Sequence, residues 1–209
     1  MKNRRTRIDA LIVASLALAV FVMLAIFAKA HVFDGVNRAV AALENSTWTA
    51  VAVAIGAAAK WYVWLIVAVV LVVVRKTRAD FGVPLTVAVA GAAMFGFVAK
   101  KLLHVARPPQ ICQLTAASGY GFPSAHTLVA TAFLGAAVYF LWRAKIAKGW
   151  KIFATIFAAA LILVIGFSRI YLGVHSLSDV LGGVAAGVFI VAATVFLKTL
   201  VQISIRRRS

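Results

Sequence analysis

The stretch from 168 to 179 concentrates side chains that could take part in a reaction. It reads SRIYLGVHSLSD and places Arg169, His175 and Asp179 between two long apolar runs. Ionisable groups at the boundary of an apolar segment are costly unless they have partners or a function, so the cluster predicts a functional site. If a helix begins near His175, Asp179 lies four residues on, on the same face, and can accept a hydrogen bond from the imidazole. Such a pair orients a histidine as a nucleophile or base.

Two further segments carry basic and hydroxyl side chains at the ends of apolar runs. Lys100 and Arg107 follow one run, and Ser124, Ala125 and His126 open the next. Ser124 is a candidate N-cap, which would direct the backbone amides of Ala125 and His126 toward an anion. Arginine binds phosphate oxygens bidentately, lysine adds a compact positive charge, and a helix start offers free amides. If the segments meet, they form a phosphate site with two histidines available for proton transfer.

The composition is that of an integral membrane protein. Hydrophobic residues make up 64% of the 209 residues, and the mean hydropathy is +1.02, far above the values of soluble domains. The net charge of +17 could suggest nucleic acid, but no polar stretch is long enough to fold a soluble binding domain, so no nucleic-acid partner is expected. The single cysteine, Cys112, excludes an intramolecular disulfide, and we expect it to be a small apolar filler.

Six apolar runs are long enough to span a bilayer: 8–28, 47–74, 83–98, 124–142, 152–167 and 177–203. The first is longer than the core of a signal peptide and is expected to stay as a helix. Asp34 to Leu43 has apolar residues at helical spacing, which suggests a short interfacial helix or an ordinary loop. Lys60, beside Trp61 and Tyr62, is typical of the outer interface of the second span, where lysine snorkels.

The basic residues predict how the chain crosses the membrane. The N-terminus, the connections at 75–78 and 143–151 and the C-terminal tail hold fourteen of the twenty-two lysines and arginines. By the positive-inside rule these segments are cytoplasmic. We therefore expect an all-α bundle of six transmembrane helices in the cytoplasmic (inner) membrane, with both termini inside and the active site facing the periplasm or exterior. Residues 1–209 would form one membrane domain, with the catalytic motifs in 100–179.

The spacing of these residues resembles a known signature. Lys100-x6-Arg107-Pro108, Pro123-Ser124-Ala125-His126 and Ser168-Arg169-x5-His175-x3-Asp179 are similar to the three motifs of the type 2 phosphatidic acid phosphatase superfamily. Its members are six-helix membrane lipid phosphatases and soluble vanadium haloperoxidases. The resemblance covers residues 95–180 closely. Ala125 stands where the second motif usually has glycine, which keeps the amide but adds a methyl group near the phosphate.

The resemblance implies a role for each residue. His175 would attack phosphorus to form a phosphohistidine, Asp179 would hold its other ring nitrogen, and His126 would protonate the leaving oxygen and then activate water. The phosphate oxygens would be bound by Lys100, Arg107, Ser124, Ala125 and Arg169. No metal and no cofactor are expected, because these cations can do the electrostatic work.

The expected reaction is hydrolysis of a phosphomonoester or diphosphate of a membrane lipid. Undecaprenyl diphosphate, phosphatidylglycerol phosphate, phosphatidic acid and lipid A phosphate are candidate substrates. A lipid phosphotransferase of the same architecture is an alternative. An anion or lipid transporter would need mid-membrane polar residues and repeat symmetry, which the sequence lacks. A zinc site from His104, His126, His175 and Asp179 would lack the close histidine pairs of usual ligand spacing. The residues indicate no particular oligomeric state.

Overall fold

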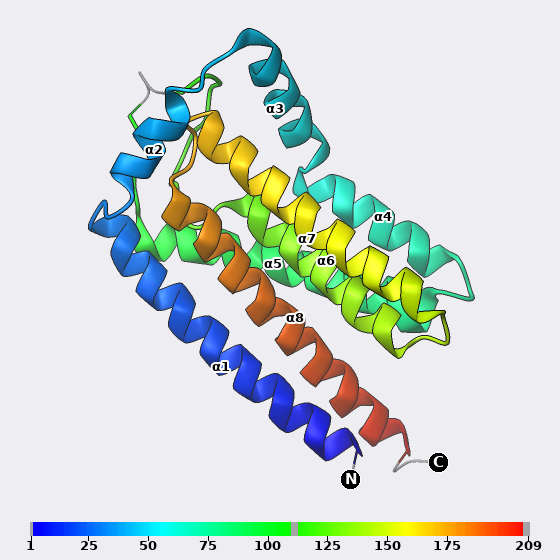
Figure 1. Cartoon of the computed structure of the whole chain (residues 1–209). Helices are drawn as coiled ribbons and strands as arrows, with labels where there is room; N and C mark the ends of the chain where they lie inside the picture. The colour runs from blue at the N-terminus through cyan, green and yellow to red at the C-terminus, as the bar shows by residue number, and fades with distance from the viewer. Residues whose placement is uncertain (1, 110–112, 207–209) are drawn as a thin grey trace.

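The computed structural model describes residues 2–109 and 113–206, which leaves Cys112, Arg207 and Arg208 outside the described residues. Within these ranges the chain is helical, with no strand (Figure 1). The elements are α1 (Lys2–Lys29), α2 (Asp34–Ala41), α3 (Ser46–Ala58), α4 (Trp61–Val73), the π-helix η1 (Arg78–Gly82), α5 (Val83–Leu103), α6 (Ala125–Arg143), α7 (Lys148–Tyr171) and α8 (Leu177–Arg206). Five helical segments are long and apolar enough to cross a membrane, and a sixth is obtained if α3 and α4 form one bent span.

The apolar run over 47–74, predicted to be the second span, is not one straight helix. The run divides into α3 and α4, whose axes differ by 44°. Lys60 has an extended backbone conformation and precedes the first residue of α4. The indole Nε1 of Trp64 donates a hydrogen bond to the Ala59 carbonyl at 3.2 Å, which gives a partner to a carbonyl freed by the break. Neither proline nor glycine stands at this break, so the sequence pattern does not announce it.

The other elements follow the sequence more closely. The segment expected to be an interfacial helix or a loop forms α2. The fifth apolar run extends further than predicted in both directions, so Lys148 and Lys151 lie in the first turn of α7 and Arg169 in its last turn. Asn45 caps α3 through its side chain, which accepts hydrogen bonds from the Thr47 and Trp48 amides at 2.9 and 3.3 Å.

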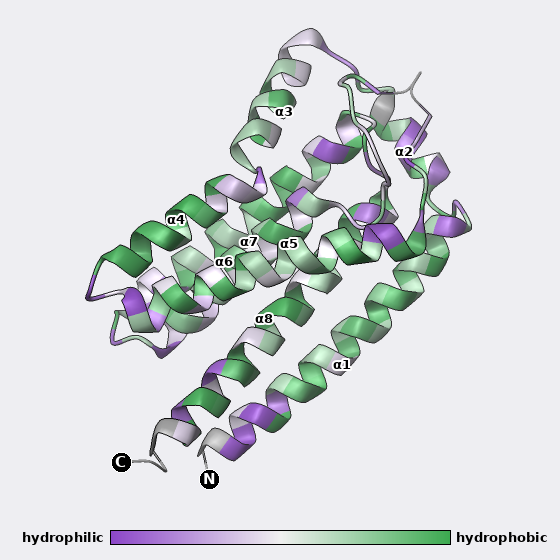
Figure 2. Cartoon of the chain, turned by 180° about the vertical axis from the view of Figure 1, so that it is seen from behind, coloured by the Kyte–Doolittle hydropathy of each residue, from purple (hydrophilic) through white to green (hydrophobic). Residues whose placement is uncertain are grey.

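The core lies where α6 packs against α5, α7 and α8, while α1 runs along α8 (Figures 1 and 2). Glycines let α6 and α8 approach closely. Gly183 faces the backbone at Ser124 and Leu128, and Gly187 faces Thr131, with no room for a larger residue. Small residues let membrane helices approach each other closely and so increase their packing contacts. The glycines in α8 have this role here. This contact fixes the start of α6 relative to the start of α8.

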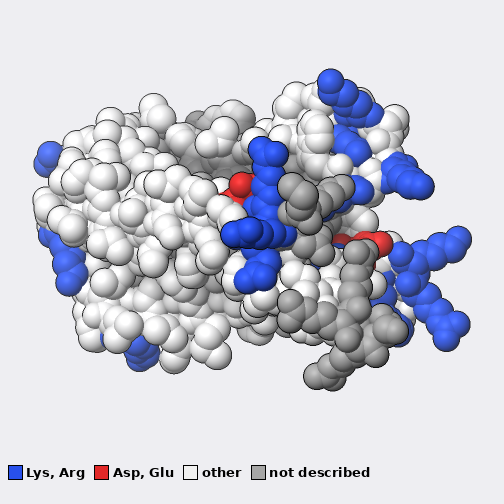
Figure 3. All heavy atoms as spheres, turned by 90° about the horizontal axis from the view of Figure 1, so that it is seen from below, with Lys and Arg blue, Asp and Glu red and all other residues white. Residues whose placement is uncertain are grey.

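The surface of the bundle agrees with a membrane location. Hydrophilic residues gather at the helix ends and in the connections, while the middles of the long helices are apolar (Figure 2). Seen from below, lysine and arginine form separate clusters with wide uncharged areas between them (Figure 3). Large apolar side chains such as Leu16, Ile26 and Leu163 are more than half exposed, at 63%, 61% and 72%. The chain is therefore a multi-pass membrane protein.

The bundle has two distinct ends. Both termini lie at the same end (Figure 1). Asp80, Arg143 and Lys198 line one hollow there, which places η1, the end of α6 and the last part of α8 together. The opposite end carries α2, α3 and the connection from α5 to α6. The two ends thus separate the segments that the basic residues assigned to opposite sides.

Replacing Gly187 with alanine tests the close packing of α6 and α8. The new Cβ would lie 2.5 Å from Thr131 Cβ and 2.7 Å from its Cγ2, so we expect the free energy of unfolding to fall by ~1–3 kcal/mol. Gly91→Ala is the control, because its Cβ would meet only Ile190 at 3.7 Å or more. Thermal unfolding in detergent should show a lower midpoint for Gly187→Ala alone. Equal midpoints for the two variants would contradict the packing described.

Candidate active site

The corner between α7 and α8 positions the predicted histidine and aspartate. The backbone carbonyl of Arg169 accepts hydrogen bonds from the Val174 and His175 amides, both at 3.3 Å, after Gly173 has turned the chain at a φ of 66°. α8 begins two residues after His175, so Asp179 lies in its first turn. The Asp179 Oδ2 atom is 3.2 Å from His175 Nδ1 and accepts the Ser176 amide at 2.9 Å. The predicted hydrogen bond between histidine and carboxylate is therefore confirmed.

The neighbours of His175 decide which ring nitrogen carries the proton. Arg107 Nη1 lies 3.2 Å from His175 Nε2, and a guanidinium can only donate. Nε2 must therefore be the acceptor, and the proton is on Nδ1, where it is donated to Asp179. The Nε2 lone pair accepts from Arg107 here, and it is free to attack an electrophile once Arg107 donates to a ligand instead.

Burial keeps this imidazole neutral. His175 is 4% exposed, and desolvation lowers its pKa from 6.5 to about 4, against the hydrogen bond and negative charge of Asp179, which raise it. At neutral pH the ring is thus neutral, with its one nitrogen-bound proton on Nδ1. Burial also lowers the pKa of Arg107 below its ordinary value, but a guanidinium stays charged in proteins.

Backbone carbonyls hold the two cations of the first motif. Lys100 Nζ donates hydrogen bonds to the carbonyls of Tyr120 and Gly121. The Arg107 guanidinium donates to Ser118 and Gly119 through Nε, and to Val174 through Nη1 at 2.7 Å. Both cations also interact electrostatically with Asp179. The connection between α5 and α6 is thereby wrapped around its own Arg107 and around Lys100 of α5.

Helix α3 completes the site, which the sequence did not indicate. Arg169 is 5% exposed, and its Nη2 donates to the carbonyl of Ala52 in α3. A side chain at Gly56 would occupy the space of the Arg169 guanidinium. The His126 ring interacts with the Gly56 backbone as well. The sequence alone does not indicate that Gly56 makes room for Arg169, because this contact joins segments that are far apart along the chain.

Ser124 has the predicted position but not the predicted side-chain contact. It is the N-cap residue of α6, yet its hydroxyl caps no amide and accepts a hydrogen bond from Thr127 Oγ1 at 3.3 Å instead. Its own amide donates to the backbone carbonyl of Asp179 at 2.9 Å. Ser124 is fully buried, so the structure gives it a connecting position between the starts of α6 and α8.

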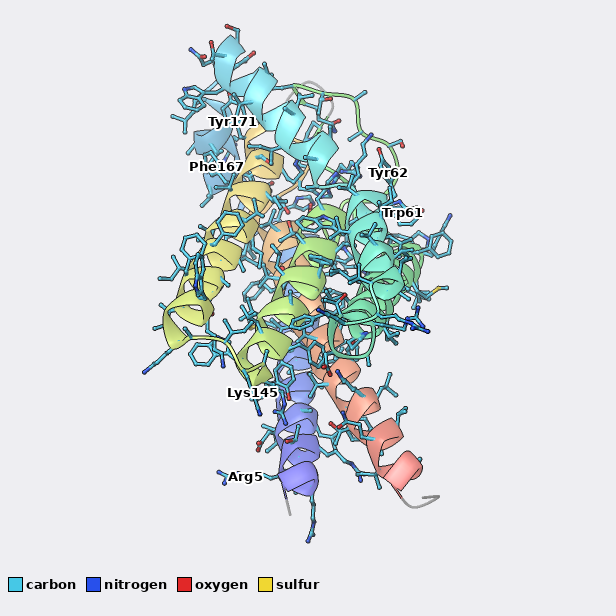
Figure 4. All side chains as sticks on the ribbon, turned by 90° about the vertical axis from the view of Figure 1, so that its right-hand side faces the viewer. Arg5, Trp61, Tyr62, Lys145, Phe167 and Tyr171 are labelled. Atoms are coloured by element: carbon cyan, nitrogen blue, oxygen red, sulfur yellow. The ribbon has the colours of Figure 1, made fainter. Side chains whose placement is uncertain are left out.

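Helix α2 holds the start of α8 from the other side. The Leu177 amide donates to the Asn37 side-chain oxygen at 3.0 Å. Tyr171 at the end of α7 donates to the Asn45 carbonyl at 3.0 Å and so fixes α7 to the start of α3. Figure 4 shows Tyr171 and Phe167 at this end of the molecule, Trp61 and Tyr62 at the start of α4, and Arg5 and Lys145 toward the opposite end.

A cavity of about 360 Å³ brings most of the predicted residues together. It is lined by Lys100, Arg107, Ala125, His126, Arg169 and His175, by Lys60, and by apolar residues of α3 and of the connections. Ser124 and Asp179 stand behind this lining. His104 is not part of it and meets the Tyr120 ring edge-on at 4.7 Å between centroids. Among the described residues, no three His, Cys, Asp or Glu side chains come together as metal ligands, so the zinc set considered above does not form.

Comparisons with known proteins found related sequences and a related fold. Residues 81–201 match the family model of the PAP2 superfamily. PAP2 is the short name of the type 2 phosphatidic acid phosphatase superfamily, whose three motifs this sequence resembles. The chain is 34% identical over 83 residues to phosphatidylglycerophosphatase B of Bacillus subtilis, which covers 39% of this chain and 41% of that protein. It is 30% identical over 134 residues to undecaprenyl-diphosphatase of Sulfolobus acidocaldarius, covering 62% and 60%.

A third relative is lipid phosphate phosphatase delta of Arabidopsis thaliana, 32% identical over 117 residues, or 51% of this chain and 28% of that protein. The matches thus span between 28% and 60% of these relatives' own lengths. The fold is similar to the crystal structure of a transmembrane PAP2 type phosphatidylglycerolphosphate phosphatase from Bacillus subtilis, with a TM-score of 0.73 and 22% identity over 90% of this chain and 96% of that one.

The pKa of His175 can be measured by NMR on protein labelled at histidine in detergent. We expect a pKa of about 4, and a still lower one in Asp179→Asn, because the carboxylate raises it. Folding should then lose stability as the pH falls from 6.5 toward 4, since the unfolded chain binds the proton more readily. A His175 pKa at or above 6.5, or one that rises in Asp179→Asn, would contradict the environment described.

Proposed function

The chain belongs to the PAP2 superfamily, and from that premise we propose that it is an integral membrane phosphatase acting on the phosphomonoester or diphosphate of a membrane lipid. One observation carries the proposal. The buried, neutral His175 lines the cavity that Lys100, Arg107 and Arg169 make positive, and its Nε2 accepts from Arg107, a cation that can turn to a phosphate oxygen. A nucleophile and three cations in one cavity fit an electrophile that carries negative charge, which phosphate provides.

In the first proposed step, His175 Nε2 attacks phosphorus. The P–N bond forms as the P–O bond to the lipid breaks, and a protonated His126 gives its proton to the leaving oxygen. The positive charge on the His175 ring is stabilised by Asp179, which already holds Nδ1. Lys100, Arg107 and Arg169 bind the equatorial oxygens and offset their charge, and the amide of Ala125 can donate to one of them.

In the second proposed step, water replaces the lipid. His126, now neutral, takes a proton from water as the oxygen attacks phosphorus, and the P–N bond breaks. Inorganic phosphate leaves, and His175 returns to its neutral form with the proton still on Nδ1. The buried contact with Asp179 supports this cycle, because the ring keeps one orientation while its charge changes.

The membrane orientation is part of the proposal. We place both termini in the cytoplasm, because the end of the bundle that carries them also carries the basic connections. The cavity would then face the periplasm or exterior of a cytoplasmic membrane. Residues 1–209 would act as one membrane domain. Because α3 borders the cavity and exposes apolar side chains such as Trp48 and Val51, a lipid tail can remain in the bilayer while its head group enters.

Phosphate release by the purified protein tests the function. We expect the wild type to hydrolyse at least one long-chain lipid phosphate or diphosphate with EDTA present, and His175→Ala to lower kcat by ~10⁴-fold or more. His104→Asn is the control, since His104 lies outside the cavity and asparagine tolerates its left-handed backbone at a φ of 50°. Absence of release from every lipid, or equal rates for wild type and His175→Ala, would refute the proposal.

Gly56→Ala tests the contribution of α3. The added methyl group would displace the Arg169 guanidinium, so we expect kcat/KM to fall by ~10²-fold although no cavity side chain is removed. Gly149→Ala is the matched control, because nothing lies within 4 Å of its added Cβ. Both variants should unfold near the wild-type midpoint. Wild-type kinetics in Gly56→Ala would show that the position of Arg169 does not depend on α3.

A further inference from the structure

Lys60 lines the cavity although it belongs to none of the three motifs. It stands in the break between α3 and α4, and Gly56, Ala57 and Lys60 form one side of the cavity, where α3 ends. A continuous helix through this point would be expected to place Lys60 among lipid-facing residues at the interface. Here α3 and α4 differ in direction by 44°, and Lys60, which lies between them, lines the cavity instead.

The ammonium group of Lys60 differs from the other cations of the cavity. Lys100, Arg107 and Arg169 each donate to backbone carbonyls of the protein. In the part of the chain that the structure describes, the Lys60 ammonium group has no hydrogen bond or ion pair, and its Nζ lies 5.8 Å from the centre of the Tyr62 ring. The side chain is also exposed. Its three donors are therefore available to a ligand.

The charges of the site indicate what this ligand would carry. Apart from the proton on His126, which the leaving oxygen takes up, Lys100, Arg107 and Arg169 supply three positive charges and Asp179 one negative charge, which leaves two. That balance suits a phosphomonoester, whose charge is about −1.5 to −2 at neutral pH. Lys60 adds one positive charge beyond this requirement. A diphosphate carries additional negative charge on its second phosphate, which the extra ammonium can offset.

The location of Lys60 indicates which phosphate it would meet. Gly56, one turn before the break, contacts the Arg169 guanidinium and interacts with the His126 ring. His126 is the proposed donor to the leaving oxygen, whereas His175 approaches phosphorus from the opposite side. Lys60 lines the cavity one turn after Gly56, so in the proposed mechanism it lies near His126 and the leaving group.

We propose that Lys60 is a specificity-determining residue that binds the second phosphate of a lipid diphosphate, the one that leaves with the lipid. This inference rests on the proposed function. His175 attacks the terminal phosphorus, the bond from that phosphorus to the bridging oxygen breaks, and the bridging oxygen departs on the lipid monophosphate. Lys60 stabilises the negative charge of that leaving group. With a lipid monophosphate the leaving group is an alcohol, which offers Lys60 no anion.

A matched pair of substrates tests the assignment. Phosphate release is measured with a polyprenyl diphosphate and the polyprenyl monophosphate of the same chain length, for wild type, Lys60→Ala and Lys60→Arg. We expect Lys60→Ala to lower kcat/KM for the diphosphate by ~10–100-fold, the worth of a charged hydrogen bond, and for the monophosphate by less than ~3-fold. Lys60→Arg should restore most of the diphosphate activity. Lys101→Ala, an exposed lysine outside the cavity lining, should change neither.

A loss of equal size with both substrates, or unchanged diphosphate kinetics in Lys60→Ala, would overturn the assignment. A second measurement does not need turnover. Inorganic diphosphate should raise the thermal midpoint of the wild type more than inorganic phosphate does, and Lys60→Ala should abolish the difference. If the difference survives in Lys60→Ala, the inference is wrong. If the wild type releases no phosphate but the difference depends on Lys60, the proposed function fails and the binding role stands.

Discussion

The structure depends on placing several cations at one end of an apolar bundle that contains only five acidic residues in 209. Burying a charge is costly unless it has close partners. Here backbone carbonyls take most of that role: those of the loop before α6 accept from Lys100, and that of Ala52 accepts from Arg169. Carbonyls orient a cation without neutralising it. The positive potential is thereby kept for an anionic ligand while each side chain has a fixed direction.

Backbone contacts between helix starts also connect the fold to the site. Glycines bring α8 against α6, and at that contact the Ser124 amide binds the Asp179 carbonyl. The start of one helix is thus tied to the residue that orients the nucleophile. Asn37 of α2 holds the first amide of α8 from outside. Loosening any of these contacts would move His175 relative to the cations rather than remove a catalytic group, which is why packing and chemistry are coupled here.

The sequence predicted correctly those features that depend only on residues close together along the chain. A histidine and an aspartate four residues apart near a helix start do form a hydrogen bond, and the apolar runs do become helices. What the sequence did not reveal depends on contacts between distant segments. The break before Trp61 needs the Trp64 indole to satisfy a carbonyl, and Gly56 matters only because Arg169 lies against it. Ser124 is the N-cap residue of α6, as predicted, but its hydroxyl accepts a hydrogen bond from the Thr127 hydroxyl and not from a backbone amide.

The most direct test of the central claim is to trap the covalent intermediate. Protein mixed rapidly with a lipid phosphate labelled at its terminal phosphorus, and quenched in alkali, should carry label that is stable in base and lost in acid, as a phosphorus–nitrogen bond requires. Peptide mapping should place it on His175, and His175→Gln should take up none. Turnover without any protein-bound label, or label on another residue, would contradict a nucleophile at His175.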